Sequence, residues 1–268
     1  MKNIIIKVGL LISFVLSTSY ALEGNTISTS SSIMQSDKIK LIDMAGKQRM
    51  LSQRMAKDYM YKGNKVATSK ADKQLKLSLR EFSTAQKKLL NSINDAEIKN
   101  LLAFVEMSVD EFKDITNQPF DMDNAQLALD LSESILEGSQ YVVDSFKNSI
   151  KHKESEIVAK SGKQRMLSQR IAKYYIAYQS GIKDKNTVDQ MKEAVKQFTA
   201  NHNALMANAT NTTTINQKLN KVNKLWKIVY KFYLGIEKGG LPFIVFTTTD
   251  DITGKMDEIT KLYVELYK

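Results

Sequence analysis

The stretch GKQRMLSQR at residues 46–54 occurs a second time, without a single change, at residues 162–170. The two copies are offset by 116 residues, and alanine followed by lysine continues the match at Ala56-Lys57 and Ala172-Lys173. Most of the chain outside these copies has diverged. The identity therefore exceeds what the packing of a helical bundle requires, and it indicates a duplicated unit that kept one functional surface.

Projected on a helix, the first copy shows two faces that favour burial. Because glycine costs about 1 kcal/mol relative to alanine inside a helix, Gly46 indicates the close approach of another group. Arg49 and Gln53 lie one turn apart beside this glycine, on a face shared with Ile42 and Met50. The opposite arc is an ordinary core-facing stripe, formed by Leu41, Met44, Ala45, Leu51, Met55, Ala56 and Tyr59. We predict that one face packs within its own bundle and the other meets a partner or ligand.

We expect different roles for three polar positions of the motif. Gln48 lies inside the apolar arc and needs a buried hydrogen-bond partner. Arg54 projects away from the glycine, so we expect Arg54 and Arg170 to pair with acids on neighbouring helices. Arg49 and Arg165 are the candidates for binding a ligand, with a structural ion pair at a helix interface as the alternative.

The run A/S-G-K-Q-R-M-L-S-Q-R resembles the signature of the PilJ-type sensor domain, the periplasmic domain of type IV pilus methyl-accepting transducers. It is also similar to the sensor domain of nitrate/nitrite sensor kinases. The resemblance implies a four-helix, up-and-down bundle with the motif on its first helix. In nitrate-binding members, the anion lies between two copies of that helix, held by the first arginine of the motif and by the backbone near the glycine.

Carried over to this sequence, the resemblance implies a ligand site at Gly46 and Arg49 and at Gly162 and Arg165. We add the glutamines one turn further along, and the predicted ligand-binding set is Gly46, Arg49, Gln53, Gly162, Arg165 and Gln169. Lys47, Leu51 and Gln53 depart from the motif of the nitrate sensor kinases. The planar fork of arginine suits nitrate, nitrite or a small carboxylate equally well, so the anion is left open.

The composition favours long helices in one or two domains. The 268 residues include only two prolines and eleven glycines, and no cysteine. The absence of cysteine excludes disulfides, thiolate chemistry and a lipid anchor on cysteine. The formal net charge of +10 fits a surface that concentrates anions or touches an anionic membrane.

The first 21 residues read as a signal peptide. Lys2 and Lys7 give the positive end, residues 8–16 the apolar stretch, and residues 19–21 a small-x-small cleavage site. No later stretch is long enough to span a bilayer. We expect a soluble periplasmic protein that begins near Leu22, a location that makes a nucleic-acid partner unexpected despite the basic charge.

Apolar spacing predicts four helices in each half. In the first half they cover residues 36–62, 69–93 and 95–116, and the fourth begins near residue 123. The second half repeats this order, and both prolines precede a phenylalanine just before the fourth helix, at residues 119 and 242. We predict an all-α protein of two tandem four-helix up-and-down bundles, with a signal peptide at 1–21, a first unit at 22–150 and a second at 151–268.

The junction between the units allows two arrangements. Residues 124–180 lack proline, and helical spacing continues through the polar run at 151–156. A continuous helix would stack the bundles end to end, and each motif would then need its counterpart from a second chain. A turn near residues 148–149 would instead pair both motif helices side by side. We favour the continuous helix.

Catalysis has few candidate residues. His152 and His202 are isolated in polar sequence, and we expect both to be solvated. No Glu-x-x-His pair supports a di-iron bundle, no zinc-ligand set occurs, and Gly46-Lys47 lacks the context of a phosphate loop. The sequence predicts no enzyme, no cofactor and no metal.

These observations predict a periplasmic protein that binds and senses a small anion, either nitrate/nitrite-like or a small carboxylate. Its signal would pass through a membrane chemoreceptor, sensor kinase or transporter. The alternative is a structural helical interaction module that binds no small ligand. A homodimer is compatible with both.

Overall fold

The structure, a computed structural model, describes residues 29–150 and 153–267. The predicted signal peptide and His152 lie outside these ranges. Within them the chain forms eight α-helices and no strand, which confirms the all-α prediction. The elements are α1 (Thr29–Gly63), α2 (Thr68–Ser92), α3 (Ala96–Thr116), α4 (Met122–Ile150), α5 (Lys153–Ser180), α6 (Lys185–Met206), α7 (Thr213–Leu234), a 3-10 turn (Ile236–Lys238) and α8 (Pro242–Leu266).

Local sequence explains where these helices begin. The side chains of Asp95, Asp184 and Thr212 accept hydrogen bonds from backbone N–H groups in the first turns of α3, α6 and α7. Pro242 opens α8, a position where its missing N–H costs nothing. The helix ends therefore fall within a few residues of those predicted, except that α1 begins earlier, at Thr29.

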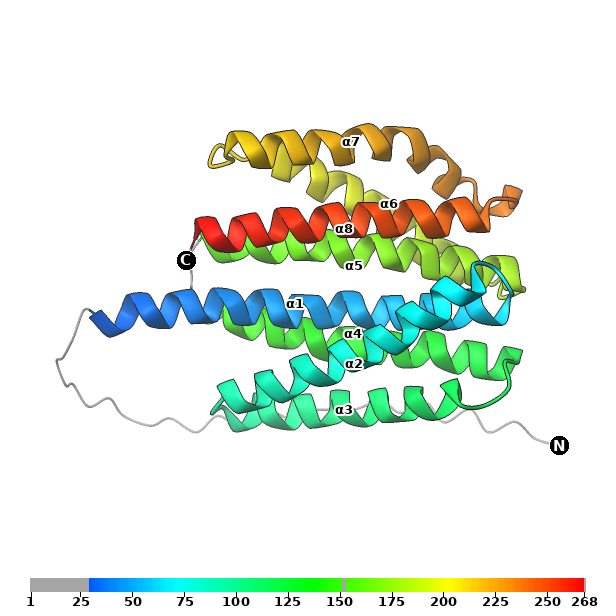
Figure 1. The fold of residues 1–268 in the computed structure, drawn as a ribbon, viewed down its shortest axis with the longest axis horizontal. Coiled ribbons are helices and arrows are strands. Elements are labelled where there is room, and N and C mark those ends of the chain that lie inside the picture. Colours follow the sequence, from blue (N-terminus) through cyan, green and yellow to red (C-terminus); the bar gives the residue numbers. More distant parts are fainter. Residues whose placement is uncertain (1–28, 151–152, 268) are drawn as a thin grey trace.

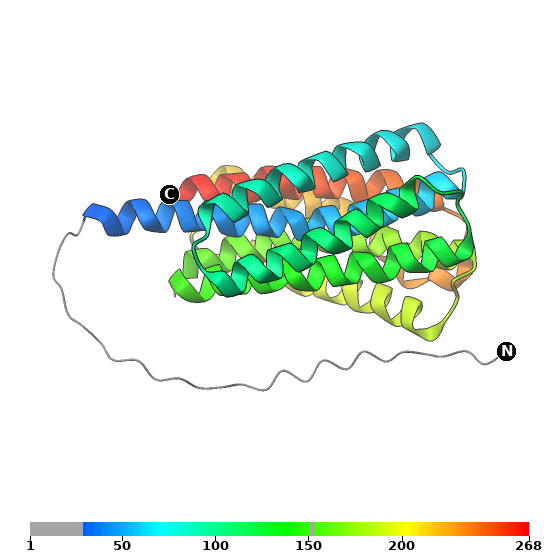
Figure 2. The same ribbon diagram turned by 90° about the horizontal axis from the view of Figure 1, so that it is seen from below.

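The two motif helices, α1 and α5, lie side by side at the centre of the molecule and run in the same direction (Figure 1). Each packs against two helices of its own unit, α1 against α2 and α4, and α5 against α6 and α8. Helices α3 and α7 complete the outer layers. Seen from below, the helices still follow one long axis, so the two bundles stand beside each other (Figure 2). Asn64 donates to Ser180 Oγ at 2.6 Å, a contact between equivalent positions that fixes the parallel register.

The prediction of a continuous helix between the units is therefore wrong. Helix α4 runs towards one end of the molecule and α5 returns from it (Figure 1). The reason lies in α5 itself, whose residues 164–169 are all buried, around the full turn of the helix. End-to-end stacking would leave one of these faces in water, whereas side-by-side packing buries both and lets one chain supply both arginines.

Two buried ion pairs join the units crosswise. Lys57 of α1 donates to Asp250 of α8 at 2.7 Å, and Lys173 of α5 binds Glu133 of α4. Both lysine side chains are fully buried, and the other unit supplies each with a carboxylate; Lys57 also pairs with Asp58 of its own helix at 3.1 Å. Burial lowers the pKa of Lys173 to about 8, although Glu133 acts to raise it. The two bundles are thus held together by charge as well as by apolar packing.

The apolar arc of the motif packs in the core as predicted, and Leu51, Met55 and Tyr59 are buried; Met50, on the second face, is buried as well. Gln48 finds the partner that its position requires. Its side-chain amide donates to Gln86 Oε1 at 2.8 Å, and Gln86 donates in turn to the Leu102 carbonyl at 2.6 Å. This chain of amides gives the side-chain NH2 group of each glutamine a buried acceptor.

The expectation of a solvated histidine is wrong for His202. Its side chain is buried on α6 and stacks on Phe198 with ring centroids 5.9 Å apart. The surrounding sequence is polar, but position 202 follows Phe198 by one helical turn and so shares its core-facing side. Burial lowers the pKa of His202 to about 4.

Removal of Glu133 should strongly destabilise the protein. Glu133→Ala leaves Lys173 buried without its carboxylate, and we expect a loss of about 3 kcal/mol in the free energy of unfolding, measured by urea denaturation at pH 7.5. Glu137→Ala, one turn along α4 at an exposed position, is the control and should change the free energy by less than about 0.5 kcal/mol. Equal effects of the two variants would show that the crosswise pair does not hold the units together.

His202 should make the protein less stable in mild acid. Because its folded pKa lies below its unfolded value, the unfolded chain binds more protons, and stability falls as pH drops from about 6.5 towards 4. Between pH 7.5 and 5.0 this contribution amounts to about 2 kcal/mol. His202→Leu should remove that part of the pH dependence in urea melts. An unchanged difference between the two pH values would contradict the assignment.

Candidate functional site

The two arginines predicted to bind a ligand meet between α1 and α5. Arg49 and Arg165 are each only 1% exposed. A Cβ atom added to Gly46 would lie 3.2 Å from Arg49 Nη2 and 3.6 Å from Arg165 Nη2, and Gly162 gives nearly the same two distances in mirrored order. The glycines therefore leave the space that both guanidinium groups use, which is the close approach that the sequence predicted.

Each arginine reaches across to the opposite motif helix. Arg49 Nη2 donates to the carbonyl of Ala159 at 3.3 Å, and Arg165 Nη2 donates to the carbonyl of Asp43 at 3.4 Å. Asp43 and Ala159 are equivalent positions of the duplication, because they are separated by the same 116 residues as the motif copies. The backbone contacts are thus related by an approximate two-fold axis between α1 and α5.

The side-chain partners break this symmetry. Arg165 donates from Nη2 to Asp43 Oδ1 and from Nη1 to Asp257 Oδ1, both at 2.6 Å. Arg49 donates from Nη1 to the neutral Oε1 of Gln140, also at 2.6 Å. Within the described ranges no ion pair joins Arg49 to a carboxylate. One arginine is therefore held by two carboxylates, and the other by an amide and a carbonyl.

The protonation equilibria of the two arginines follow this difference. Burial, followed by repulsion from Arg165, lowers the pKa of Arg49 to about 10. Burial opposes the charge of Arg165 as well, but attraction from Asp43 and Asp257 outweighs it and raises the pKa of Arg165. Both groups remain charged at neutral pH, and the charge on Arg49 is the less well compensated of the two.

A cavity of about 290 Å³ lies beside Arg49. Helices α1, α4, α5 and α6 all contribute to its walls. It is lined by Arg49, Gln140, Val143, Asp144, Lys147, Glu156, Ala159, Lys160, Lys163 and Asn201. Sequence reasoning predicted only Arg49 among these residues, because the others lie outside the repeated motif or, like Lys163, were assigned no role.

Positive charge dominates this cavity. Arg49 and three lysines face two carboxylates, Asp144 and Glu156. Asp144 is already engaged, since it accepts from Gln140 at 2.8 Å and pairs with Lys147 at 3.2 Å. Burial and the neighbouring Arg49 lower the pKa of Lys163, which shows how closely these cations lie. A small anion entering the cavity would relieve their repulsion.

Gln53 and Gln169, the remaining predicted site residues, do not line this cavity. Gln53 donates to the carbonyl of Ser132 on α4 at 3.1 Å, and Gln169 donates to Thr253 Oγ1 on α8 at 2.6 Å. Each glutamine thus ties a motif helix to the fourth helix of its own unit. A direct part in ligand binding stays a prediction that this geometry does not favour.

The second arginine of each motif behaves differently in the two copies. Arg170 donates to Glu133 and to Gln190, both at 2.7 Å, as expected for a structural arginine. Arg54 forms no such ion pair within the described ranges, and it acts through space on Asp58 and Asp250. Both remain apart from the cavity beside Arg49.

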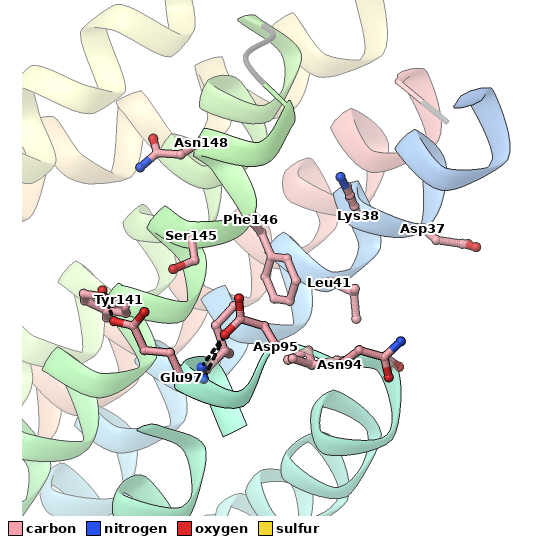
Figure 3. A pocket seen from close by; sticks show the side chains of 13 residues that line it. Asp37, Lys38, Leu41, Asn94, Asp95, Glu97, Tyr141, Ser145, Phe146 and Asn148 are labelled. Carbon is pink, nitrogen blue, oxygen red and sulfur yellow. Dashed lines mark hydrogen bonds between the residues drawn. The ribbon is translucent and has the colours of Figure 1, made fainter. Parts of the chain in front are cut away.

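A larger cavity, of about 860 Å³, lies at the end of the first bundle between α1, the α2–α3 loop and the end of α4 (Figure 3). Three carboxylates line it, those of Asp37, Asp95 and Glu97, against the single cation Lys38 among its described residues. Asp95 caps α3, and Glu97 accepts from Tyr141 at 2.9 Å. The cavity contains no residue of the repeated motif, and its charge repels an anion.

The fold and site define a class of protein: a tandem pair of four-helix bundles that buries an arginine pair between two parallel, repeated helices. The chain belongs to the PilJ family, whose model, described as "Type IV pili methyl-accepting chemotaxis transducer N-term", matches residues 34–128 and 148–232. That description is of a sensory chemotaxis domain. Neither the curated proteins nor the solved structures gave a match to this chain.

The family match confirms the resemblance seen in the repeated motif and its occurrence in two segments. Domains of this family act in chemoreceptors together with membrane signalling partners, so membership indicates a role in sensing. None of the helices in the ranges 29–150 and 153–267 is both long enough and apolar enough to cross a membrane.

Alanine in place of a motif glycine should leave the folded protein less stable than alanine in place of a glycine with open space around it. Gly254→Ala on α8 adds a methyl group that meets nothing within 4 Å, so we expect a gain of up to about 1 kcal/mol from helix propensity. Gly162→Ala places the same group 3.2 Å from Arg165 Nη2, which Asp43 and Asp257 hold in place. Urea denaturation should show Gly162→Ala to be at least about 1 kcal/mol less stable than Gly254→Ala. Equal stability of these variants would contradict the close approach.

Proposed function

We propose that this chain is a periplasmic sensor domain that binds a small anion in the cavity beside Arg49 and signals through a membrane partner. The observation that carries the proposal is the incompletely compensated guanidinium of Arg49, buried at the wall of a cavity that three lysines also line. A buried charge of this kind is costly unless an opposite charge accompanies it. An anion from solution supplies that charge.

The position of the cavity suits a sensor. Its lining residues come from both units, because Arg49 and Gln140 belong to the first bundle and Ala159 and Lys163 to the second. A bound anion would draw these groups together at the place where α4 gives way to α5. Binding would thereby change the relative position of two bundles that pack together mainly along α1 and α5. A membrane chemoreceptor or kinase that contacts both bundles could read such a change.

The interactions available support moderate affinity. A charge-assisted hydrogen bond contributes roughly 1.5–3 kcal/mol, and Arg49 with one or two lysines offers a few of them. After the cost of ordering the ligand, this corresponds to a dissociation constant of about millimolar to micromolar. Affinity in that range suits the detection of an abundant small anion, and it makes occupancy respond to concentration.

Arg165 offers a specific reason to keep the second reading, a helical interaction module without a small ligand. Its guanidinium already has two carboxylate partners inside the chain and needs none from solution. If Arg49 were equally structural, the repeated motif would serve only to hold α1 against α5. The two readings differ in what Arg49 does, so Arg49 is the residue to test.

Binding can be tested by calorimetry and by thermal shift against nitrate, nitrite, formate, acetate and succinate, at constant ionic strength in chloride. We expect at least one of these anions to raise the melting temperature by mass action. Arg49→Ala should weaken binding of that anion roughly ten- to a hundredfold, because it removes a charge-assisted donor.

Arg54→Ala is the matched control, since it removes an arginine five residues along the same helix that does not line the cavity. Its affinity for the anion should stay within about twofold of the wild type, a change of less than about 0.5 kcal/mol. If no anion shifts the melting temperature, or if Arg49→Ala and Arg54→Ala weaken binding equally, the interaction-module reading replaces this one.

A further inference from the structure

The duplication supplies an internal comparison for the cavity beside Arg49, because each residue on one side of the approximate two-fold axis has a counterpart on the other. From this comparison, and resting on the proposed anion site, we infer that the ligand is a small organic carboxylate that takes, at Arg49, the place that the Asp43 side chain takes at Arg165. The chain would then carry one ligand site and one site occupied by its own side chain.

The backbone around the two arginines is the same on both sides. The carbonyl of Asp43 accepts from Arg165 at 3.4 Å, and that of Ala159 accepts from Arg49 at 3.3 Å. The side chains at these two positions differ by one group. Asp43 carries a carboxylate that binds Arg165 Nη2 at 2.6 Å, whereas Ala159 ends at its methyl. At this pair of positions the Arg49 side therefore lacks one carboxylate group that the Arg165 side has.

The fourth helices repeat the difference. Gln140 and Asp257 are counterparts, since each accepts from Nη1 of the motif arginine in its own unit at 2.6 Å. Asp257 brings a negative charge and Gln140 brings none. One turn further along these helices the charges are reversed, because Asp144 follows Gln140 and Lys261 follows Asp257. Asp144 is bound to the Gln140 amide and to Lys147, so of the two arginines Arg165 is the one with carboxylates as direct hydrogen-bond partners.

The cavity lies on the side where the carboxylate is missing. Ala159 is part of its wall, so the volume that an aspartate would enter at this position is cavity volume. At about 290 Å³ the cavity is larger than a carboxylate group, which leaves room for an organic substituent. Lys160 and Lys163 line the same space and favour a ligand with more than one polar group. These features favour an organic acid over a bare inorganic anion.

Two reciprocal variants test this inference. Ala159→Asp should supply the missing carboxylate from within, so the ligand-free protein should melt about 2–4 °C higher, a change typical of 1 kcal/mol in a chain of this size. The same variant should lower the affinity for sodium acetate at least tenfold. Ala159→Asn fills the same space without charge, and it should not raise the melting temperature of the ligand-free protein.

Asp43→Ala should open the opposite side. The variant should melt at a lower temperature than the wild type in chloride, because Arg165 loses a carboxylate. Sodium acetate at equal ionic strength should restore stability, and calorimetry should count two acetate sites per chain in place of one. This rescue does not depend on the folding of Ala159→Asp, so it keeps the inference open to refutation if that variant fails to fold.

The outcomes separate this inference from the proposed function. Acetate binding that is lost in Ala159→Asp, together with acetate rescue of Asp43→Ala, supports both. Two outcomes would overturn the carboxylate inference and leave an anion sensor. In the first, the wild type binds nitrate but not acetate. In the second, acetate binding survives in Ala159→Asp yet is lost in Arg49→Ala. If no anion binds the wild type and Ala159→Asp gains no stability, both are overturned.

Discussion

Two guanidinium groups buried against each other are the constraint on which the rest of this structure depends. Arg49 and Arg165 carry like charges into a space from which water is excluded, and such an arrangement is unfavourable unless other groups compensate it. Gly46 and Gly162 provide the room, and carbonyls of the opposite helix accept one hydrogen bond from each arginine. The parallel alignment of α1 and α5 follows from these reciprocal contacts.

Duplication placed the same motif on both sides of this interface, and divergence outside the motif made the sides unequal. The crosswise pairs from Lys57 to Asp250 and from Lys173 to Glu133 join the bundles in both directions. Around the arginines the symmetry ends, because Asp43 faces Arg165 while an alanine stands at the equivalent place. Under the proposed function, the side of Arg165 is the fixed one and the side of Arg49 is the one that responds to a ligand.

The sequence was sufficient to predict the helices, their number in each half and the family. These features depend on local patterns: the spacing of apolar residues, capping side chains such as Asp95 and Asp184, and the exact repetition of the motif. It was not sufficient for the arrangement of the bundles, because unbroken helical spacing near residue 150 is compatible with a straight helix or a reversal. It also misplaced His202, whose burial depends on neighbours from another helix.

The candidate site shows the same division. By itself the sequence indicated which arginines and glycines form the site, since a glycine inside a buried helix face leaves space for a group that the fold brings near. That the two copies meet within one chain was decided only by the tertiary structure, because the favoured continuous helix would have taken the counterpart from a second chain. Only the tertiary structure decided what else they meet: Asp43 and Asp257 at one arginine, Gln140 and a cavity at the other. These partners lie on other helices, some of them in the other unit, and their charges act through space. The sequence contains the motif twice, but it does not show which of the two arginine charges is balanced by carboxylates elsewhere in the chain.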